Sequence, residues 1–218
     1  HVQVTCVTAP GVGFNHTWQL TIGHQTDDGT TVLQSSYRRP ELTRWSNPEL
    51  AVGARSQGGE VLVLEGRHFG PVNANNTFTA TYANPSLRGL AGSTFVAACE
   101  VVEAATKASC LTAPGVGFNH TWLVVVGHQT DDRSERIASS YLPPTIDAVT
   151  VATADGLLST EGGEWVYLNG SNFGPNTTEA GADVHRGPSA VNVINASYAN
   201  PNLLSERVGG ALAGRTYH

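Results

Sequence analysis

The chain contains Cys6-Val-Thr-Ala-Pro-Gly-Val-Gly-Phe-Asn-His-Thr-Trp18 and, 104 residues later, Cys110-Leu-Thr-Ala-Pro-Gly-Val-Gly-Phe-Asn-His-Thr-Trp122. Over residues 6–28 and 110–132, 18 of 23 aligned residues are identical, which chance does not produce. The chain is therefore built from repeated units.

Shorter matches extend the repeat through the rest of the chain. Gly58-Gly59-Glu60 and Phe69-Gly70-Pro71 recur at the same offset as Gly162-Gly163-Glu164 and Phe173-Gly174-Pro175. Tyr82-Ala83-Asn84-Pro85 recurs as Tyr198-Ala199-Asn200-Pro201 at an offset of 116, so the later unit contains an insertion of 12 residues.

The period and the local patterns predict an all-β fold. A period near 104 residues is too long for a solenoid repeat and fits one immunoglobulin-sized antiparallel sandwich. Short runs of alternating or continuous apolar residues are separated by Gly, Pro and Asn turns, and no window has a sustained helical period. In this pattern Trp18, Trp122 and Trp165 are predicted core residues, whereas Trp45 precedes no alternating strand and is predicted at a surface or interdomain contact.

The repeat divides the chain into three parts. Residues 1–40 correspond to the C-terminal part of a unit, 41–141 to a complete unit, and 142–218 to the N-terminal part of a unit. A sandwich without a third of its strands exposes apolar faces and unpaired backbone, so we expect each partial unit to be completed. Further sequence of a longer tandem array or strands of a neighbouring copy would complete them, and both arrangements imply a head-to-tail line of units.

Three cysteines are present. Cys99 and Cys110 lie in the complete unit, where we expect a disulfide that stabilises by roughly 3 kcal/mol. Cys6 is the counterpart of Cys110, and the counterpart of Cys99 would fall beyond His218, so we expect Cys6 to pair with a neighbouring copy or with sequence outside this chain. A functional free thiol at Cys6 is the alternative.

Six N-glycosylation sequons support an extracellular or cell-surface glycoprotein with covalent N-linked glycans. The alternative is that these asparagines only form turns. The acceptor residues are Asn15, Asn75, Asn119, Asn169, Asn176 and Asn195.

Composition excludes other classes. The formal charge is −6, and Lys107 is the only lysine, so no basic field is available for nucleic acid. The longest apolar runs are far shorter than the ~20 residues of a membrane helix. The chain has no Met and no leader-like start, so we expect a processed chain or a fragment.

The Gly-rich motif of the later unit resembles the start of an IPT/TIG domain. It reads Gly162-Gly163-Glu164-Trp165-Val166-Tyr167-Leu168-Asn169-Gly170-Ser171-Asn172-Phe173-Gly174-Pro175, and the first copy at residues 58–71 departs from the usual pattern at His68. Residues 110–117 resemble that family's later cysteine strand and turn. The resemblance implies tandem early-set immunoglobulin-like sandwiches with a binding or structural role, not an enzyme. The sequons favour the extracellular branch of the family.

No motif for catalysis, a metal or a cofactor stands out. The duplicated pairs His16 with His24 and His120 with His128 are separated by strand residues and are predicted to be surface or turn histidines. Asp27-Asp28 and Asp131-Asp132 provide too few oxygens for calcium and are predicted in solvated hairpin turns. Ser35-Ser36 and Ser139-Ser140 have no nucleophile-elbow pattern around them.

These observations favour a non-enzymatic extracellular structural glycoprotein. Its units would join head to tail with other copies of itself into a fibre, with Arg39-Pro40 and Pro143-Pro144 as stiff joints. The alternatives are a fragment of a receptor or adhesin ectodomain that binds protein or carbohydrate, and the accessory part of a glycan-acting enzyme whose catalytic part lies elsewhere.

Overall fold

The computed structural model describes residues 3–29, 31–47, 53–72, 77–87, 93–131, 137–175, 197–199 and 207–209. In these residues the regular structure is β-strand, apart from one short 3-10 helix, η1 (Pro85–Leu87). The all-β prediction is therefore confirmed. No helix in this part of the chain is long and apolar enough to cross a membrane.

The strands are short at the two ends of the chain and longer in its middle. In chain order they are β1 (His16–Thr17), β2 (Thr21–Ile22), β3 (Gln25–Thr26), β4 (Gln34–Ser35), β5 (Glu41–Ser46), β6 (Val61–Arg67), β7 (Phe78–Ala83), β8 (Thr94–Glu103), β9 (Lys107–Leu111), β10 (His120–Val126), β11 (Gln129–Thr130), β12 (Ala138–Ser139), β13 (Thr145–Val151), β14 (Val166–Ser171), β15 (Ser197–Ala199) and β16 (Arg207–Gly209).

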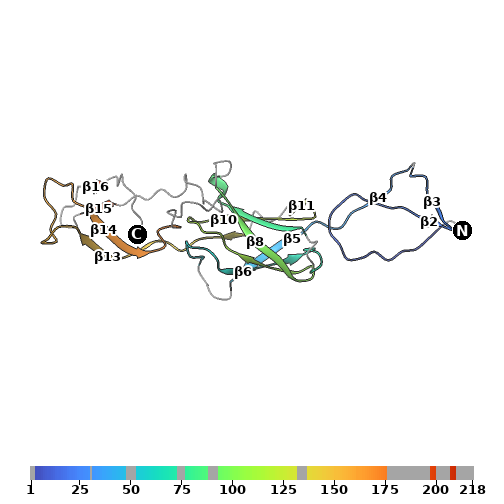
Figure 1. Ribbon diagram of the computed structural model, residues 1–218, viewed down its shortest axis with the longest axis horizontal. Helices are drawn as coiled ribbons and strands as arrows, with labels where there is room; N and C mark the ends of the chain where they lie inside the picture. The colour runs from blue at the N-terminus through green and yellow to red at the C-terminus, as the bar shows by residue number, and fades with distance from the viewer. Residues whose placement is uncertain are drawn as a thin grey trace.

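Strands β5 to β12 form one curled antiparallel sheet, here called the central unit (residues 41–141; Figure 1). Its order is β11-β10-β7-β8-β9-β6-β5, and β12 also pairs with β10. The sheet curls because β8 changes partner along its length. Ala97 still pairs with β7, and Ala98 already pairs with β9. The two halves of β8 thus belong to two faces that enclose a core between them.

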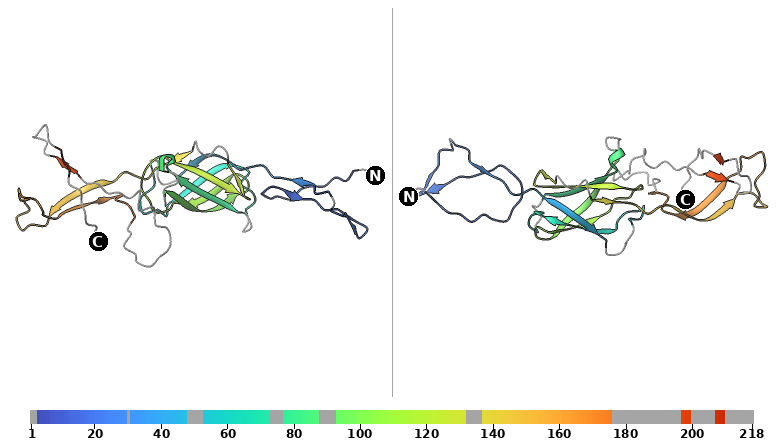
Figure 2. Two further views of the ribbon diagram at one scale, coloured as in Figure 1. Left: turned by 90° about the horizontal axis from the view of Figure 1, so that it is seen from above. Right: turned by 180° about the vertical axis from the view of Figure 1, so that it is seen from behind.

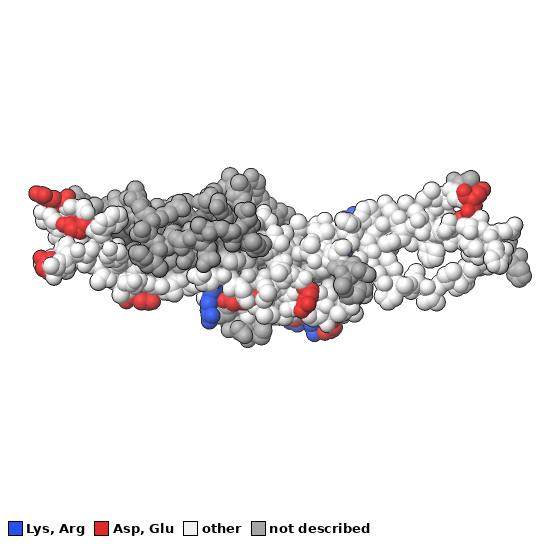
Figure 3. Space-filling model, in the orientation of Figure 1, with Lys and Arg blue, Asp and Glu red and all other residues white. Residues whose placement is uncertain are grey.

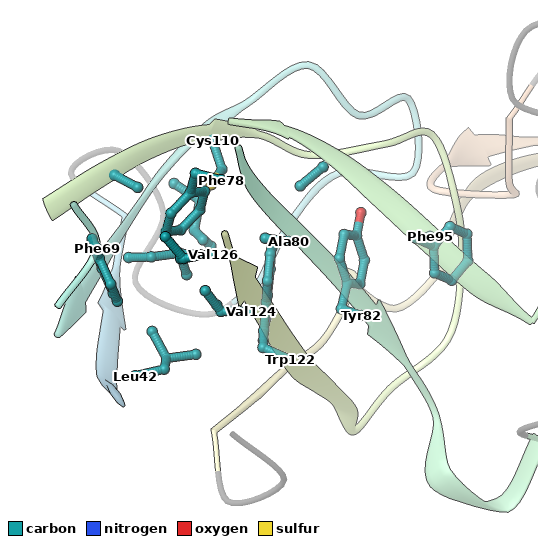
Figure 4. Close-up of a cluster of buried hydrophobic side chains, with 14 of the residues drawn as sticks. Leu42, Phe69, Phe78, Ala80, Tyr82, Phe95, Cys110, Trp122, Val124 and Val126 are labelled. Atoms are coloured by element: carbon teal, nitrogen blue, oxygen red, sulfur yellow. The ribbon is translucent and has the colours of Figure 1, made fainter. Parts of the chain in front are cut away.

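The core of the central unit contains aromatic and aliphatic side chains from both faces (Figure 4). Trp122 on β10 is fully buried and stacks on Tyr82 of β7, with ring centroids 4.5 Å apart. Tyr82 also stacks on Phe95 of β8 at 5.1 Å. Leu62 and Leu64 of β6 close the core from the other face.

Polar links tie the two faces together, and a disulfide joins two neighbouring strands of one face. The hydroxyls of Tyr82 and Tyr141 lie 2.6 Å apart, and Tyr141 donates to the carbonyl of Ala113 at 2.7 Å. Cys99 on β8 and Cys110 on β9 occupy paired register positions and form a disulfide. The contacts of Tyr82 thereby hold Ala113 and Tyr141, in the late part of the unit, against β7.

The two ends of the chain repeat parts of the central unit strand by strand. Strand β13 pairs with β14 as β5 pairs with β6, and both pairs have a bulge after the second residue of the first strand. Strands β1 and β4 pair as β10 and β12 do, and β2 and β3 pair as β10 and β11 do. Every one of these shared pairings is displaced by the 104 residues of the sequence repeat.

The molecule is elongated, and its parts follow one another along the long axis (Figures 1 and 2). Strands β1 to β4 lie beyond one end of the central unit, and β13 and β14 lie beyond the other end. The segments that correspond to the late and the early strands of a unit are therefore at opposite ends of the same copy.

The structure corrects the prediction for Trp45. This residue lies within β5, packs against the core as a partly buried side chain, and donates from its indole nitrogen to the carbonyl of Ala138 at 2.8 Å. It is a link inside the central unit because β5 is a strand, which the sequence pattern did not indicate. Pro40, a predicted joint residue, directly precedes β5 and is fully buried.

Candidate assembly site

Residues 3–29 and 31–37, here called the N-terminal segment, expose side chains whose counterparts form the core of the central unit. Trp18 is 48% exposed, whereas Trp122 is 0% exposed. Ile22 is 63% exposed, whereas Val126 is 1% exposed. The predicted core role is therefore confirmed for Trp122 and not for Trp18. Large apolar side chains that are exposed here but buried in the equivalent unit indicate a surface where another protein surface binds.

The N-terminal segment nevertheless keeps the local structure of its buried counterpart. Trp18 donates from its indole nitrogen to the hydroxyl of Ser35 at 2.9 Å, the same distance as from Trp122 to Ser139. The backbone amides of Asn15 and Asn119 donate to Ser36 and Ser140, each at 3.0 Å. The paired serines are thus held by structural hydrogen bonds, and the segment already has the shape of the late strands of a unit.

Residues 145–175, here called the C-terminal segment, have the structure of the early strands. Ile146 and Val149 on β13 are exposed, whereas their counterparts Leu42 and Trp45 contact the core of the central unit. Gly170 allows the ring of Phe173 to lie against it, as Gly66 does for Phe69. The segment is therefore folded like β5 and β6 but without the late strands that cover their inner face.

The prediction that Trp165 is a core residue is wrong. Trp165 is 60% exposed, and its counterpart Val61 is still 42% exposed in the complete central unit. The position faces outward in both places, because the inner face of β6 belongs to Leu62 and Leu64. Tyr167, two residues further on, is exposed as well.

A buried carboxylate joins the early and late strands of the central unit. Asp131 follows β11, is 3% exposed, and accepts a hydrogen bond from the backbone amide of Leu42 at 2.8 Å. The predicted solvated turn is therefore wrong for Asp131, because the early strand β5 covers it. The equivalent pair at the ends of the chain is the carboxylate of Asp27 and the backbone amide of Ile146.

The N-terminal segment meets the central unit in a close backbone contact. A Cβ atom placed on Gly127 would lie 2.5 Å from the backbone nitrogen of Gly13, so only glycine allows this approach. The side-chain amide of Gln129 donates to the backbone carbonyl of Tyr37 at 3.1 Å, and Val12 packs against the core of the central unit. A shallow groove at this junction is lined by Phe14, Asn15, Ser36, Arg39, His128 and Gln129.

The same turn, one repeat later, meets the C-terminal segment. Val116 is the counterpart of Val12, and its methyl group lies 3.4 Å from the position that a Cβ atom on Gly174 would occupy. Both junctions in the chain therefore use the turn that follows the cysteine strand, and each places the next unit further along the axis.

Charge is sparse at the N-terminal segment (Figure 3). Its residues up to Tyr37 include only two with formal charges, Asp27 and Asp28. The central unit has surface ion pairs instead, such as Arg44 with Glu65 at 2.6 Å. A surface of apolar strands with few charges is suited to burial against another strand layer.

The histidines divide into two groups. His24 and His128 lie in turns with positive φ, as predicted. His120 is 1% exposed, so the surface prediction is wrong for it, because the rings of Tyr82, Phe95 and Tyr141 surround its imidazole. Burial lowers the pKa of His120 below its usual value, and a hydrogen bond to the carbonyl of Val116 opposes this shift. No group of three or more His, Cys, Asp or Glu side chains in the described ranges could hold a metal.

The predicted glycan acceptors Asn15, Asn119 and Asn169 are exposed. Asn15 and Asn119 have positive φ, which asparagine tolerates in turns, so glycosylation of these sites stays a prediction. Asn75, Asn176 and Asn195 lie outside the described residues.

Cys6 is exposed and forms no disulfide with the described residues. Sequence reasoning missed Asp131 and Gly127 as contact residues, although both belong to stretches that are identical in the two repeats.

Comparison with known proteins finds no matching protein family, no similar curated protein and no similar solved structure.

Proposed function

We propose that this protein is a non-enzymatic, extracellular structural glycoprotein whose units join head to tail with other copies into a fibre. The observation that carries this proposal is the repeated junction. Val12 packs against the central unit and Val116 lies against Gly174 of the following segment, so the same turn advances the chain along one axis twice. A head-to-tail contact that does not close on itself generates a filament.

The exposed faces at the two ends support the same conclusion. Trp18 and Ile22 at one end, and Ile146 and Val149 at the other, occupy positions whose counterparts contact the core of the central unit. Leaving such surface in water is unfavourable by roughly 25 cal/mol per Å² of apolar area. A linear assembly that covers both faces removes this cost.

The type of unit and its surroundings complete the proposal. We take the curled sheet, in which β8 belongs to both faces, to be an early-set immunoglobulin-like sandwich of the IPT/TIG type, repeated in tandem. The Cys99–Cys110 disulfide fits an oxidising, extracellular compartment. Sugars on the exposed sequon asparagines would coat the sides of the fibre.

Electron microscopy of the native protein tests this function. We expect filaments in which sandwich-sized units follow one another, with two units added by each copy. The negative control is the same preparation after denaturation and refolding at low concentration, which should contain short or single copies. Native material that remains as monodisperse single copies at every concentration contradicts the fibre and favours an adhesive ectodomain.

A further inference from the structure

We infer that the C-terminal segment of one copy receives the N-terminal segment of a second copy, and that the two together form one further unit with the strand register of the central unit. This inference rests on the proposed fibre and specifies how its copies join. The central unit is the template, because it contains both segments in their bound arrangement.

The receiving surface is already folded. Strands β13 and β14 reproduce the pairing of β5 and β6, including the bulge, and Phe173 lies beside Gly170 as Phe69 lies beside Gly66. In the central unit this pair is covered by β9 on its open edge and by late-strand side chains on its inner face. In the C-terminal segment Ile146 remains exposed on that face.

The hairpins of the entering segment are folded as well, whereas residues 3–9, which include Cys6, are not in a strand. The hairpins of β1 with β4 and β2 with β3 have the registers of β10 with β12 and β10 with β11. The hydroxyl of Tyr37 donates to the carbonyl of Ala9 at 2.6 Å, as Tyr141 does to Ala113 at 2.7 Å. Association therefore needs little reordering of the hairpins or of the β13–β14 pair, which reduces its entropic cost, and residues 3–9 become a strand on binding.

The register of the central unit names the contacts of the new unit. Leu62 pairs with Cys110, so Val166 of the first copy is opposite Cys6 of the second copy. The amide of Leu42 donates to the carboxylate of Asp131, so the amide of Ile146 meets the carboxylate of Asp27. The only formal charges of the entering segment up to Tyr37 are carboxylates. One of them, Asp27, lies at the position where the central unit buries the carboxylate of Asp131.

The junction between units gives a second, independent set of contacts. Gly127 lies against Gly13 in the chain, so Gly23 of the second copy lies against Gly117 of the first. Gln129 donates to the carbonyl of Tyr37, so Gln25 of the second copy donates to the carbonyl of Tyr141. Within one copy, a Cβ atom on Gly23 would have no neighbour within 4 Å.

The occupant is a second copy because one copy cannot close on itself. The central unit lies between the N-terminal segment and β13 and β14, at opposite ends of the long axis (Figure 2). The entering segment of the same copy lies at the far end of this axis, so the proposal assigns the receiving surface to a second copy.

A two-component disulfide experiment tests the register. One chain has Val166→Cys and Cys6→Ala, and its partner is the unchanged chain, in which Cys6 is exposed. The two chains are mixed in a glutathione redox buffer and separated on a non-reducing gel. We expect one disulfide-linked heterodimer, because directly paired residues of neighbouring strands place their side chains on the same face within disulfide distance.

The matched control is Tyr167→Cys with Cys6→Ala. Tyr167 is the next residue of β14 and its side chain is exposed, so random oxidation would favour it, yet it is on the opposite face from Cys6 in the proposed register. We expect at least a tenfold lower yield of heterodimer than with Val166→Cys. An equal yield from both variants, or no heterodimer from Val166→Cys, overturns the inference.

A second variant tests the junction and does not depend on a new cysteine. Gly23→Asn is made in the partner chain that retains Cys6. Asparagine tolerates the φ of 55° at this turn, but its side chain enters the space required by Gly117 of the other copy. We expect it to reduce the heterodimer yield about tenfold. Gly29→Asp, at a φ of 64° and with no neighbour within 4 Å, creates no sequon and should leave the yield unchanged. Equal yields from the two variants contradict the proposed junction.

Microscopy of the unchanged chain separates this inference from the fibre itself. Filaments without the Val166–Cys6 heterodimer would show that the fibre is joined in another way. The heterodimer without filaments would show that the joint is correct and that the fibre is not its product.

Discussion

Residues 6–28 and 110–132 have nearly the same sequence and the same local hydrogen bonds, but opposite environments. In the later repeat, Trp122 is inside a core built with β6 and β7, whereas in the earlier repeat Trp18 is half exposed. The indole nitrogen of each tryptophan still donates to a serine hydroxyl at 2.9 Å. The hairpins are therefore determined locally, and burial depends on the early strands of a unit.

The comparison also separates two kinds of stability. Turn residues and short side-chain hydrogen bonds are present in both repeats, and each hydrogen bond contributes about 0.5–1.5 kcal/mol. Of the two stretches, 110–132 has apolar side chains buried in a core, whereas Trp18 and Ile22 of the other are exposed. Most of the free energy of unfolding of a single copy should thus come from residues 41–141, and the two end segments should gain theirs on assembly.

Alanine at the two tryptophans gives the largest expected difference. Trp122→Ala removes a fully buried side chain and should reduce the free energy of unfolding of the central unit by about 3–5 kcal/mol. Trp18→Ala should change it by no more than about 1 kcal/mol, the loss of one exposed hydrogen bond. Denaturant unfolding of dilute single copies measures both values. Similar losses from the two substitutions would show that the N-terminal segment is buried in the single copy.

The cysteines sharpen the comparison. Replacing Cys99 and Cys110 together with alanine removes the disulfide that joins β8 to β9 and should reduce the free energy of unfolding by about 3 kcal/mol. Cys6→Ala should leave that value unchanged, because Cys6 is exposed and is not part of this disulfide. Denaturant unfolding with and without a reducing agent measures the difference. A loss with Cys6→Ala of similar size would place Cys6 in a contact of the single copy.

Several features of the fold could be predicted from the sequence for a clear physical reason. Apolar alternation and frequent Gly, Pro and Asn turns indicate strands, and no window shows a helical period, so the all-β class follows. The repeat aligns the cysteine strands and therefore the hairpins of residues 6–28 and 110–132.

Other features depend on which face of a strand is covered, and the sequence does not say. Val61, Leu62, Val63 and Leu64 are all apolar, so alternation could not show that Trp165, the counterpart of Val61, faces outward. Asp131 looks like an ordinary turn residue, and only the position of β5 over it explains its burial. The role of Trp45 was missed because a single aromatic residue in a polar strand leaves no periodic signal.

The buried His120 gives the smallest effect, which depends on pH. The pKa of His120 is lowered in the folded state by burial, so the unfolded chain binds more protons as the pH falls. The free energy of unfolding of the central unit should therefore decrease as the pH falls below about 6.5, by at most about 1.4 kcal/mol per pH unit, until the folded histidine is also protonated.

Denaturant unfolding between pH 7.5 and 5.5 measures this slope above the range in which ordinary carboxylates titrate. His120→Gln changes the stability at every pH and should remove most of the slope, because the buried imidazole is its source. A slope of the same size in His120→Gln would contradict this assignment, because the buried imidazole would then not be its source.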